Sequence, residues 1–381
     1  MRTLLFTGPG GAGTTTLAAG AAVQAARAGR RTVLVSRQRP LVEGVDDVDG
    51  LTVVRVDALA AAEGIWERHA GVLAAALPHV DLPPASSVVP PPGAAELAVL
   101  AALGRASADA DLVVLDAGPL EAGLALLALP AGLRWWLDVA LPPRVRALGA
   151  IRTAAVRSGA ARSGPLDALL AALPAVERLA ATPLADPAAT SVVLTAQARA
   201  GAVPALRSAA TTLGLLGQRP AAVLARVLPG GGTGTWWTQR LAEQDEAVAG
   251  LAEIATVRPV AECATTPADV AGLAPLAVEL PEPEPLPVPA AERLDGAWRL
   301  SLPLPFAERD QVELTRWADD LVITVGGVRR SVRLDSLLRR CAVTGGRLEE
   351  PGTAAARLEV TFAPDPRLWP ADLLPAEESA S

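Results

Sequence analysis

The feature that most constrains this chain is a glycine-rich loop near its N-terminus. Residues 4–18 read LLFTGPGGAGTTTLA: an apolar run, Arg2 to Thr7, comes before four closely spaced glycines, and a helical pattern follows from Thr15 to Ala28. A short apolar run that ends at glycine is typical of a buried strand, and Gly29 suits the end of a helix. Together with the apolar run Thr32 to Ser36, this order predicts a βαβ unit and a mostly parallel sheet.

Further runs extend the α/β pattern along residues 1–280. The expected strands are Leu51 to Val56, Asp111 to Asp116, Ser191 to Thr195, Ala221 to Val227 and Glu253 to Val257. The expected helices are Ala58 to Leu77, Ala94 to Ser107, Ala202 to Leu213 and Trp236 to Leu251. An Ala/Leu-rich stretch at about residues 142–186 carries few strand signals, so we expect it to form a helical insertion in this domain.

The pattern changes after a proline-rich linker, residues 281–291. Alternating prolines favour an extended chain and prevent helix and ladder pairing. Beyond them, Leu321, Ile323 and Val325 alternate with polar residues and lead into Gly326-Gly327, which predicts a hairpin. Similar alternation on both sides predicts a small antiparallel β-sandwich over residues 292–370, and residues 371–381 read as a disordered tail.

Composition narrows the class of protein. The 381 residues carry a net charge of −7, which gives no general attraction to nucleic acid or to an anionic membrane. Two cysteines, Cys263 and Cys341, cannot build a disulfide scaffold or a four-ligand zinc site, and we expect a cytoplasmic protein. The longest apolar region, Leu120 to Leu137, is interrupted by charges and proline, so we expect no integral membrane protein. There is no lysine, asparagine or tyrosine, so all cationic side chains except those of His69 and His79 are arginines.

The chemistry of the loop depends on three elements. Glycines let backbone N–H groups converge on a phosphate, a helix N-terminus adds partial positive charge, and a lysine adds a full charge. Here the first two are present, Thr15 suits a magnesium ligand, and Thr14 stands where the lysine belongs. The loop alone leaves three possibilities open: a βα turn that binds nothing or only adventitious anions, a weak nucleotide or anion site, or a competent hydrolase.

The loop GPGGAGTTT, residues 8–16, resembles the deviant Walker A motif of the ArsA-type anion-transporting ATPases. That family includes arsenite-pump ATPases and the ATPases that target tail-anchored membrane proteins. The resemblance implies a P-loop NTPase-like α/β fold, with Pro9 at the position of the signature lysine and Thr14 at that of the P-loop lysine.

Several other segments carry the same resemblance in the same order. DAGPLEAGLALLALP, Asp116 to Pro130, is similar to switch II, with Ala122 in place of its histidine. PPGAAELAVLAAL, Pro91 to Leu103, resembles the helix upstream of it. RVLP, Arg226 to Pro229, resembles the strand end beside adenine, with Ala225 in place of asparagine. SRQRP, Ser36 to Pro40, occupies switch I, so Gln38 replaces the water-positioning aspartate.

The resemblance implies a set of site residues. ATP would lie against Gly8, Gly10, Gly11, Gly13, Thr14, Thr15, Thr16, Asp116, Pro119 and Arg226, with Thr15 and Asp116 on the magnesium side. No catalytic residue is assigned, because the lysines, the switch I aspartate, the histidine and the asparagine are all replaced. We therefore expect a pseudo-ATPase, with an active or weakly active ATPase as the alternative. Arg37 or Arg39 could supply the missing charge, or could be solvated loop residues.

The C-terminal part, Arg293 to Trp369, resembles the α-crystallin-like (small heat-shock) domain appended to some ArsA-type proteins. The resemblance implies a homodimer and a chaperone-like role on a hydrophobic client or membrane-protein partner. A docking or dimerisation module without client activity is the alternative, and the net charge gives no reason to expect nucleic acid as a partner. The CxxC of the zinc-binding members is absent, so no zinc is expected. Trp135-Trp136 could pack in the core or a dimer, or could form a client-binding surface.

Overall fold

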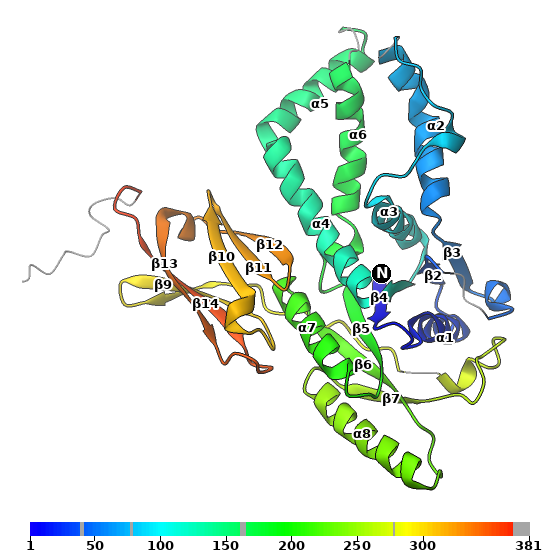
Figure 1. Ribbon diagram of the computed structural model, residues 1–381. Helices are drawn as coiled ribbons and strands as arrows, with labels where there is room; N and C mark the ends of the chain where they lie inside the picture. Colours follow the sequence, from blue (N-terminus) through cyan, green and yellow to red (C-terminus); the bar gives the residue numbers. More distant parts are fainter. Residues whose placement is uncertain (39–41, 77–78, 161–164, 277–278, 369–381) are drawn as a thin grey trace, which may run out of the picture.

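A seven-stranded parallel sheet forms the centre of the first domain (Figure 1). The computed structural model describes residues 1–38, 42–76, 79–160, 165–276 and 279–368. The strand order is β3-β2-β4-β1-β5-β6-β7, and every neighbouring pair is parallel. The strands are β1 (Arg2–Gly8), β2 (Thr32–Ser36), β3 (Leu51–Arg55), β4 (Leu112–Pro119), β5 (Thr190–Gln197), β6 (Pro220–Val227) and β7 (Val257–Ala261).

Helices cover both faces of this sheet, which explains the continuous apolar runs in its strands. Successive side chains of a strand point to opposite faces, so Leu5 lies in one core and Leu4 and Phe6 lie in the other. Helix α1 (Thr14–Arg27) covers the second core. The first is covered by α3 (Ala94–Asp109), α4 (Leu120–Ala140), α7 (Ala202–Leu215) and α8 (Thr235–Ala252). The α/β class with a parallel sheet is confirmed.

A helical region extends from the sheet between β4 and β5 (Figure 1). It contains α4, α5 (Pro143–Arg157), α6 (Pro165–Ala180) and a 3₁₀ turn at Pro183–Ala185, and α2 (Ala58–Ala76) rises beside it. Among the described helices, α4 alone is long and apolar enough, by length and composition, to cross a membrane. It packs on β1 and β4 at one end and on α6 along its length, as a helix built into a domain does.

The second domain consists of two antiparallel sheets packed around one core. One sheet has the order β10-β11-β12 and the other β13-β14-β9-β8. The strands are β8 (Ala291–Leu294), β9 (Ala297–Pro303), β10 (Val312–Trp317), β11 (Asp320–Val325), β12 (Val328–Arg333), β13 (Cys341–Glu349) and β14 (Arg357–Pro364). The Gly326-Gly327 hairpin joins β11 to β12 as expected, with Val325 opposite Val328. The predicted tail, residues 371–381, lies outside the described residues.

One strand prediction was wrong. Residues Glu253 to Val257 were expected to be a strand, but Glu253 caps α8 and the strand β7 starts only at Val257. The reason is Pro259, which argues against a strand because proline cannot donate to a ladder. β7 tolerates it because this strand lies at the edge of the sheet and pairs only with β6.

The two domains are packed tightly against each other through α7. Leu215 of α7 is completely buried among the core residues of the β-sandwich. The Thr211 hydroxyl donates to the carbonyl O of Pro305 at 2.6 Å, and the Arg330 guanidinium of β12 donates to the carbonyl O of Leu215. Burial lowers the pKa of Arg330, with a smaller contribution from nearby Arg134. The linker also contacts the first domain, since Pro285 forms a single antiparallel bridge with Gln218 where no pairing was expected.

Candidate functional site

The glycine-rich loop connects β1 to α1 and turns the first amide groups of the helix toward one shared space. Gly13 has φ 84°, in the left-handed region that favours glycine, and it is the N-cap of α1 without a side-chain cap. Gly8 allows a close approach of β5, because a Cβ there would lie 2.2 Å from the carbonyl O of Thr195. The amides at the start of a helix have no acceptor within the helix and attract anions.

A cavity of about 180 Å³ opens at this loop. Its lining residues are Gly8, Pro9, Gly10, Gly11, Gly13, Thr14, Thr15, Thr16, Gln38, Gly118 and Pro119. The loop residues and Pro119, which were predicted to bind ATP, therefore lie together around one space, as does Gln38. Asp116 and Arg226 are close to the loop but not among the lining residues. Within the described part of the chain, no charged side chain lines the cavity.

Thr14, at the position of the P-loop lysine, is fixed by the sheet. Its side-chain hydroxyl lies 2.7 Å from that of Thr195 on β5, and Thr195 Oγ1 also donates to the carbonyl O of Thr7 at 3.4 Å. Thr14 is 8% exposed and Thr195 is completely buried. The side chain at this position is therefore a buried structural group that carries no charge into the cavity.

The residues on the predicted magnesium side are held by a polar network. Thr15 Oγ1 donates to Gln38 Oε1 at 3.3 Å. Ser36 Oγ lies 2.7 Å from Asp116 Oδ2 and 2.8 Å from the carbonyl O of Gln38, and it accepts from the Gln38 amide at 3.0 Å. Asp116 Oδ1 accepts from the amide of Gly118 at 3.1 Å. Asp116 is thus a buried carboxylate, 2% exposed, that is stabilised by a hydroxyl and a backbone amide.

Two further residues hold the loop from the side of β5 and β6. Arg226 Nη1 donates to the carbonyl O of Gly11 at 2.9 Å, and Gln197 Nε2 donates to the same oxygen at 3.1 Å. Arg226 Nη2 also lies 3.6 Å from Glu262. Sequence reasoning gave no site role to Gln197, Thr195 or Ser36, although Ser36 begins the predicted switch I segment. Their common signal is a place at or near the carboxyl end of a parallel strand, where such sheets present residues to a ligand.

Of the two arginines considered as substitutes for the lysine, Arg37 is not among the residues that line the cavity. Arg37 Nη1 lies 3.3 Å from Glu96 Oε1 on α3, so its charge is directed to that helix. Arg39 lies outside the described residues. In the part of the chain that is described, no three His, Cys, Asp or Glu side chains gather in a way that could hold a metal ion.

The tryptophan pairs have different environments. Trp135 packs against Trp317 of β10 with ring centroids 5.9 Å apart, so it belongs to the contact between α4 and the β-sandwich. Its neighbour Trp136 is edge-on to it at 5.0 Å and is 63% exposed. In the second pair, Trp237 packs on Gly232 while Trp236 is largely exposed. In each pair, one ring is therefore packed against the protein and the other is exposed to solvent.

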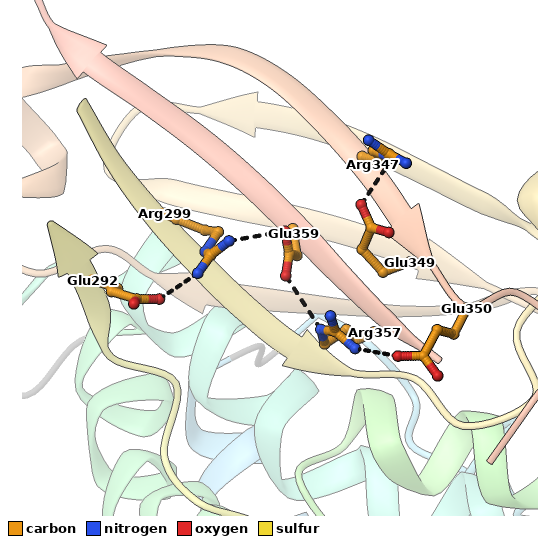
Figure 2. Close-up of polar contacts among 7 residues, drawn as sticks. All are labelled: Glu292, Arg299, Arg347, Glu349, Glu350, Arg357 and Glu359. Carbon is orange, nitrogen blue, oxygen red and sulfur yellow. Dashed lines mark hydrogen bonds and ion pairs between the residues drawn. The ribbon is translucent and has the colours of Figure 1, made fainter. Parts of the chain in front are cut away.

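The outer face of the four-stranded sheet carries a chain of ion pairs (Figure 2). Arg299 on β9 pairs with Glu292 on β8 at 2.7 Å and with Glu359 on β14 at 3.4 Å. Glu359 continues to Arg357 at 3.2 Å, and Arg357 continues to Glu350 at 2.8 Å. This face is charged and internally paired, so it is no apolar client surface.

These observations define a class of protein: a P-loop-like α/β domain whose glycine loop is intact and uncharged, joined to a small β-sandwich. A family model described as the HSP20-like domain found in ArsA matches residues 295–362, which is the β-sandwich. The chain belongs to the ArsA-related family whose members carry this HSP20-like domain.

Two relatives are similar over nearly their whole lengths. The uncharacterized protein SCO2128 of Streptomyces coelicolor is 37% identical over 97% of this chain and 99% of its own length. The protein Rv2184c of Mycobacterium tuberculosis is 31% identical, with 97% of each chain covered. Both similarities therefore span the α/β domain and the β-sandwich together.

Proposed function

We propose that this protein is a pseudo-ATPase of the ArsA-related family that acts as a client- or partner-binding, chaperone-like protein. One observation carries the proposal: the side chain at the lysine position, Thr14, is a buried hydroxyl bonded to Thr195. With no charged side chain among the described lining residues, the cavity keeps only the partial charges of the backbone.

The size of the missing interaction supports this reading. A unit charge 4 Å from phosphate is worth about 4 kcal/mol at an effective dielectric constant of 20. A helix N-terminus contributes about half a charge, and its effect is typically below about 1 kcal/mol at exposed sites. The loop would therefore lose several orders of magnitude in stabilising the transferring phosphoryl group, for which catalysis depends almost entirely on positioning and charge.

ATP and Mg²⁺ fit the site only in part. The glycine loop suits a phosphate, with Gly8, Gly10, Gly11, Gly13, Thr15 and Thr16 around the cavity. Thr15 and Asp116 are the groups that would face magnesium, but Thr15 is bonded to Gln38 and Asp116 to Ser36. Magnesium, if bound, would supply positive charge that stabilises the phosphates. The groups that would position a water or stabilise the transition state are replaced, so we derive no hydrolytic step. No zinc is proposed.

The alternative is an active or weakly active anion-transporting or targeting ATPase. It is favoured by the retention of Thr15 and Asp116, with Asp116 held in a defined orientation by Ser36 and Gly118. The two functions differ in turnover rather than in fold.

The partner-binding part of the proposal relies on the second domain and the helical region. The HSP20-like domain supports a chaperone-like activity on a hydrophobic client or membrane-protein partner, in a cytoplasmic homodimer that does not bind nucleic acid. Suppression of client aggregation should then depend on the β-sandwich.

A thermal shift with Mg-ATP, combined with phosphate release, separates the two functions. A ligand at one hundred times its Kd stabilises the fold by about 2.7 kcal/mol, so binding without turnover supports a pseudo-ATPase. Turnover that Asp116→Ala abolishes would contradict it and support the ATPase. If neither a shift nor turnover is observed, the ATPase is excluded and the protein acts without nucleotide.

A further inference from the structure

The cavity at the glycine-rich loop has no carboxylate among its described lining residues. The polar side chains that line it belong to Thr14, Thr15, Thr16 and Gln38. Mg²⁺ is usually bound through one or two carboxylates together with phosphate oxygens of the substrate. In this cavity, the side chains that line it would therefore offer the ion only hydroxyl and carboxamide oxygens.

Asp116, the carboxylate expected on the magnesium side, is already engaged by the protein. Strands β2 and β4 pair in register at Ser36 and Asp116, so the sheet fixes these two residues side by side. The Ser36 hydroxyl lies 2.7 Å from Asp116 Oδ2, and the Gly118 amide donates to Oδ1 at 3.1 Å. Both carboxylate oxygens thus have protein partners, and Asp116 is only 2% exposed.

Gln38 places a neutral carboxamide beside Thr15. Gln38 Oε1 accepts from Thr15 Oγ1 at 3.3 Å, and the backbone amide of Gln38 donates to Ser36 Oγ at 3.0 Å. The Thr15 hydroxyl keeps its lone pairs, but the group next to it carries no negative charge for a cation. A carboxamide also has two N–H donors. With Oε1 directed to Thr15, the Nε2 group is the part of Gln38 that can donate to a phosphate oxygen.

We propose that the loop binds the phosphates of a nucleotide without Mg²⁺, and that the Gln38 carboxamide donates to a phosphate oxygen in place of the metal ion. The loop amides and the helix N-terminus favour the same anion. The inference rests on the proposed function, because a protein that holds nucleotide without transferring phosphate does not need the metal ion that neutralises the developing charge.

Isothermal titration calorimetry of the full chain with ATP tests the proposal, once with excess Mg²⁺ and once with EDTA. We expect similar dissociation constants in the two buffers. The thermal shift produced by ATP in the same buffers is a second measurement, and the gain in melting temperature should likewise not depend on the metal.

Three variants test the part played by Gln38, which is exposed, so its replacement should not prevent folding. Gln38→Asp places a carboxylate beside Thr15, and ATP should then bind at least about tenfold more tightly with Mg²⁺ than with EDTA, the lower end of the effect of supporting residues on metal affinity. Gln38→Ala should weaken binding about tenfold in both buffers, the loss expected for one hydrogen bond to a charged group. Gln239→Asp makes the same charge change at an exposed position of α8 outside the lining residues, and should leave binding independent of the metal.

Several results would overturn the proposal: ATP binding only with Mg²⁺, ATP binding in neither buffer, or a Gln38→Asp variant as independent of the metal as the native chain. Equal metal dependence in Gln38→Asp and Gln239→Asp would also overturn it, because the effect would then be one of total charge. Phosphate release from the same samples keeps the two proposals apart. Turnover contradicts the pseudo-ATPase, whereas metal-dependent binding without turnover contradicts this inference alone.

Discussion

Thr14 and Thr195 share a hydrogen bond of 2.7 Å between their side-chain hydroxyls, and this bond ties the start of α1 to strand β5. It connects two residues that are 181 positions apart in the sequence. In a loop that binds nucleotide, the side chain at this position would contact the ligand. Here the Thr14 side chain instead connects the loop to the sheet.

The bond should be measurable by a double-mutant cycle. Thr195→Val leaves the Thr14 hydroxyl without this partner, at a cost of about 1–3 kcal/mol in the free energy of unfolding. Thr14→Val should cost less, because the Thr195 hydroxyl keeps its hydrogen bond to the carbonyl O of Thr7. The double variant should cost less than the sum, with a coupling energy of about 1 kcal/mol. Denaturant unfolding provides the measurement, and strictly additive effects would show that the bond contributes nothing.

Two glycines of the loop should respond oppositely to alanine. Gly8→Ala places a Cβ 2.2 Å from the backbone of Thr195, so β1 and β5 must separate, and we expect a loss of about 2–3 kcal/mol or more in stability, as for other strained core substitutions. Gly10→Ala meets no atom within 4 Å and has no positive φ, so it should be neutral or stabilising by about 0.4–1 kcal/mol. Thermal unfolding of the two variants, both without ligand, compares them directly; similar losses would contradict the packing described.

Gly214 should control the contact between the two domains. An alanine Cβ there would lie 2.6 Å from Pro305 Cδ and 2.8 Å from the carbonyl O of Pro303. We expect Gly214→Ala to weaken the docking of the β-sandwich and to split one calorimetric unfolding transition into two. Gly104→Ala, also within a helix but facing open space, is the control and should leave a single transition. A single transition in both variants would mean that the domains do not depend on this contact.

The ion-pair chain on the β-sandwich should be sensitive to salt. Glu359 is shared by Arg299 and Arg357, whereas Glu349 pairs with the exposed Arg347. Hydrogen bonds to Glu292 and to Glu350 raise the pKa of Arg299 and of Arg357, respectively. Glu359→Gln should therefore lower the melting temperature more than Glu349→Gln at low ionic strength. The difference should shrink at 1 M salt, where the screening length is about 3 Å. A difference that persists at high salt would point to packing instead.

The sequence predicted those parts of the molecule whose signals are local. The glycine loop, the apolar strands and the Gly326-Gly327 hairpin could be read from neighbouring residues, and their types were confirmed. Strand β7 was misplaced because a proline is compatible with a strand only at a sheet edge, and the edge position is a property of the whole sheet.

The glycine-rich loop of the candidate site could be predicted from the sequence, but the residues that hold it in place could not. Residues such as Thr195, Gln197 and Ser36 reach the loop from separate strands, and nothing in their local pattern distinguishes them from other polar residues at strand ends. The same holds for Arg37, whose charge could be directed to the cavity or away from it. Only the position of α3 directs it to Glu96. The contacts of these side chains therefore depend on the order of the strands and the position of the helices, which the local sequence does not specify.

Leu215 belongs to α7 by sequence and to the β-sandwich by its surroundings, where it is completely buried. The proline-rich segment is therefore not the boundary between two parts of the chain that could fold independently. A chain cut at residues 281–289 would leave a leucine-sized hole in one fragment and an exposed apolar side chain on the other. Proteolysis, truncation or domain exchange at that segment thus yields two incomplete pieces, and the two halves are expected to be inherited, expressed and degraded together.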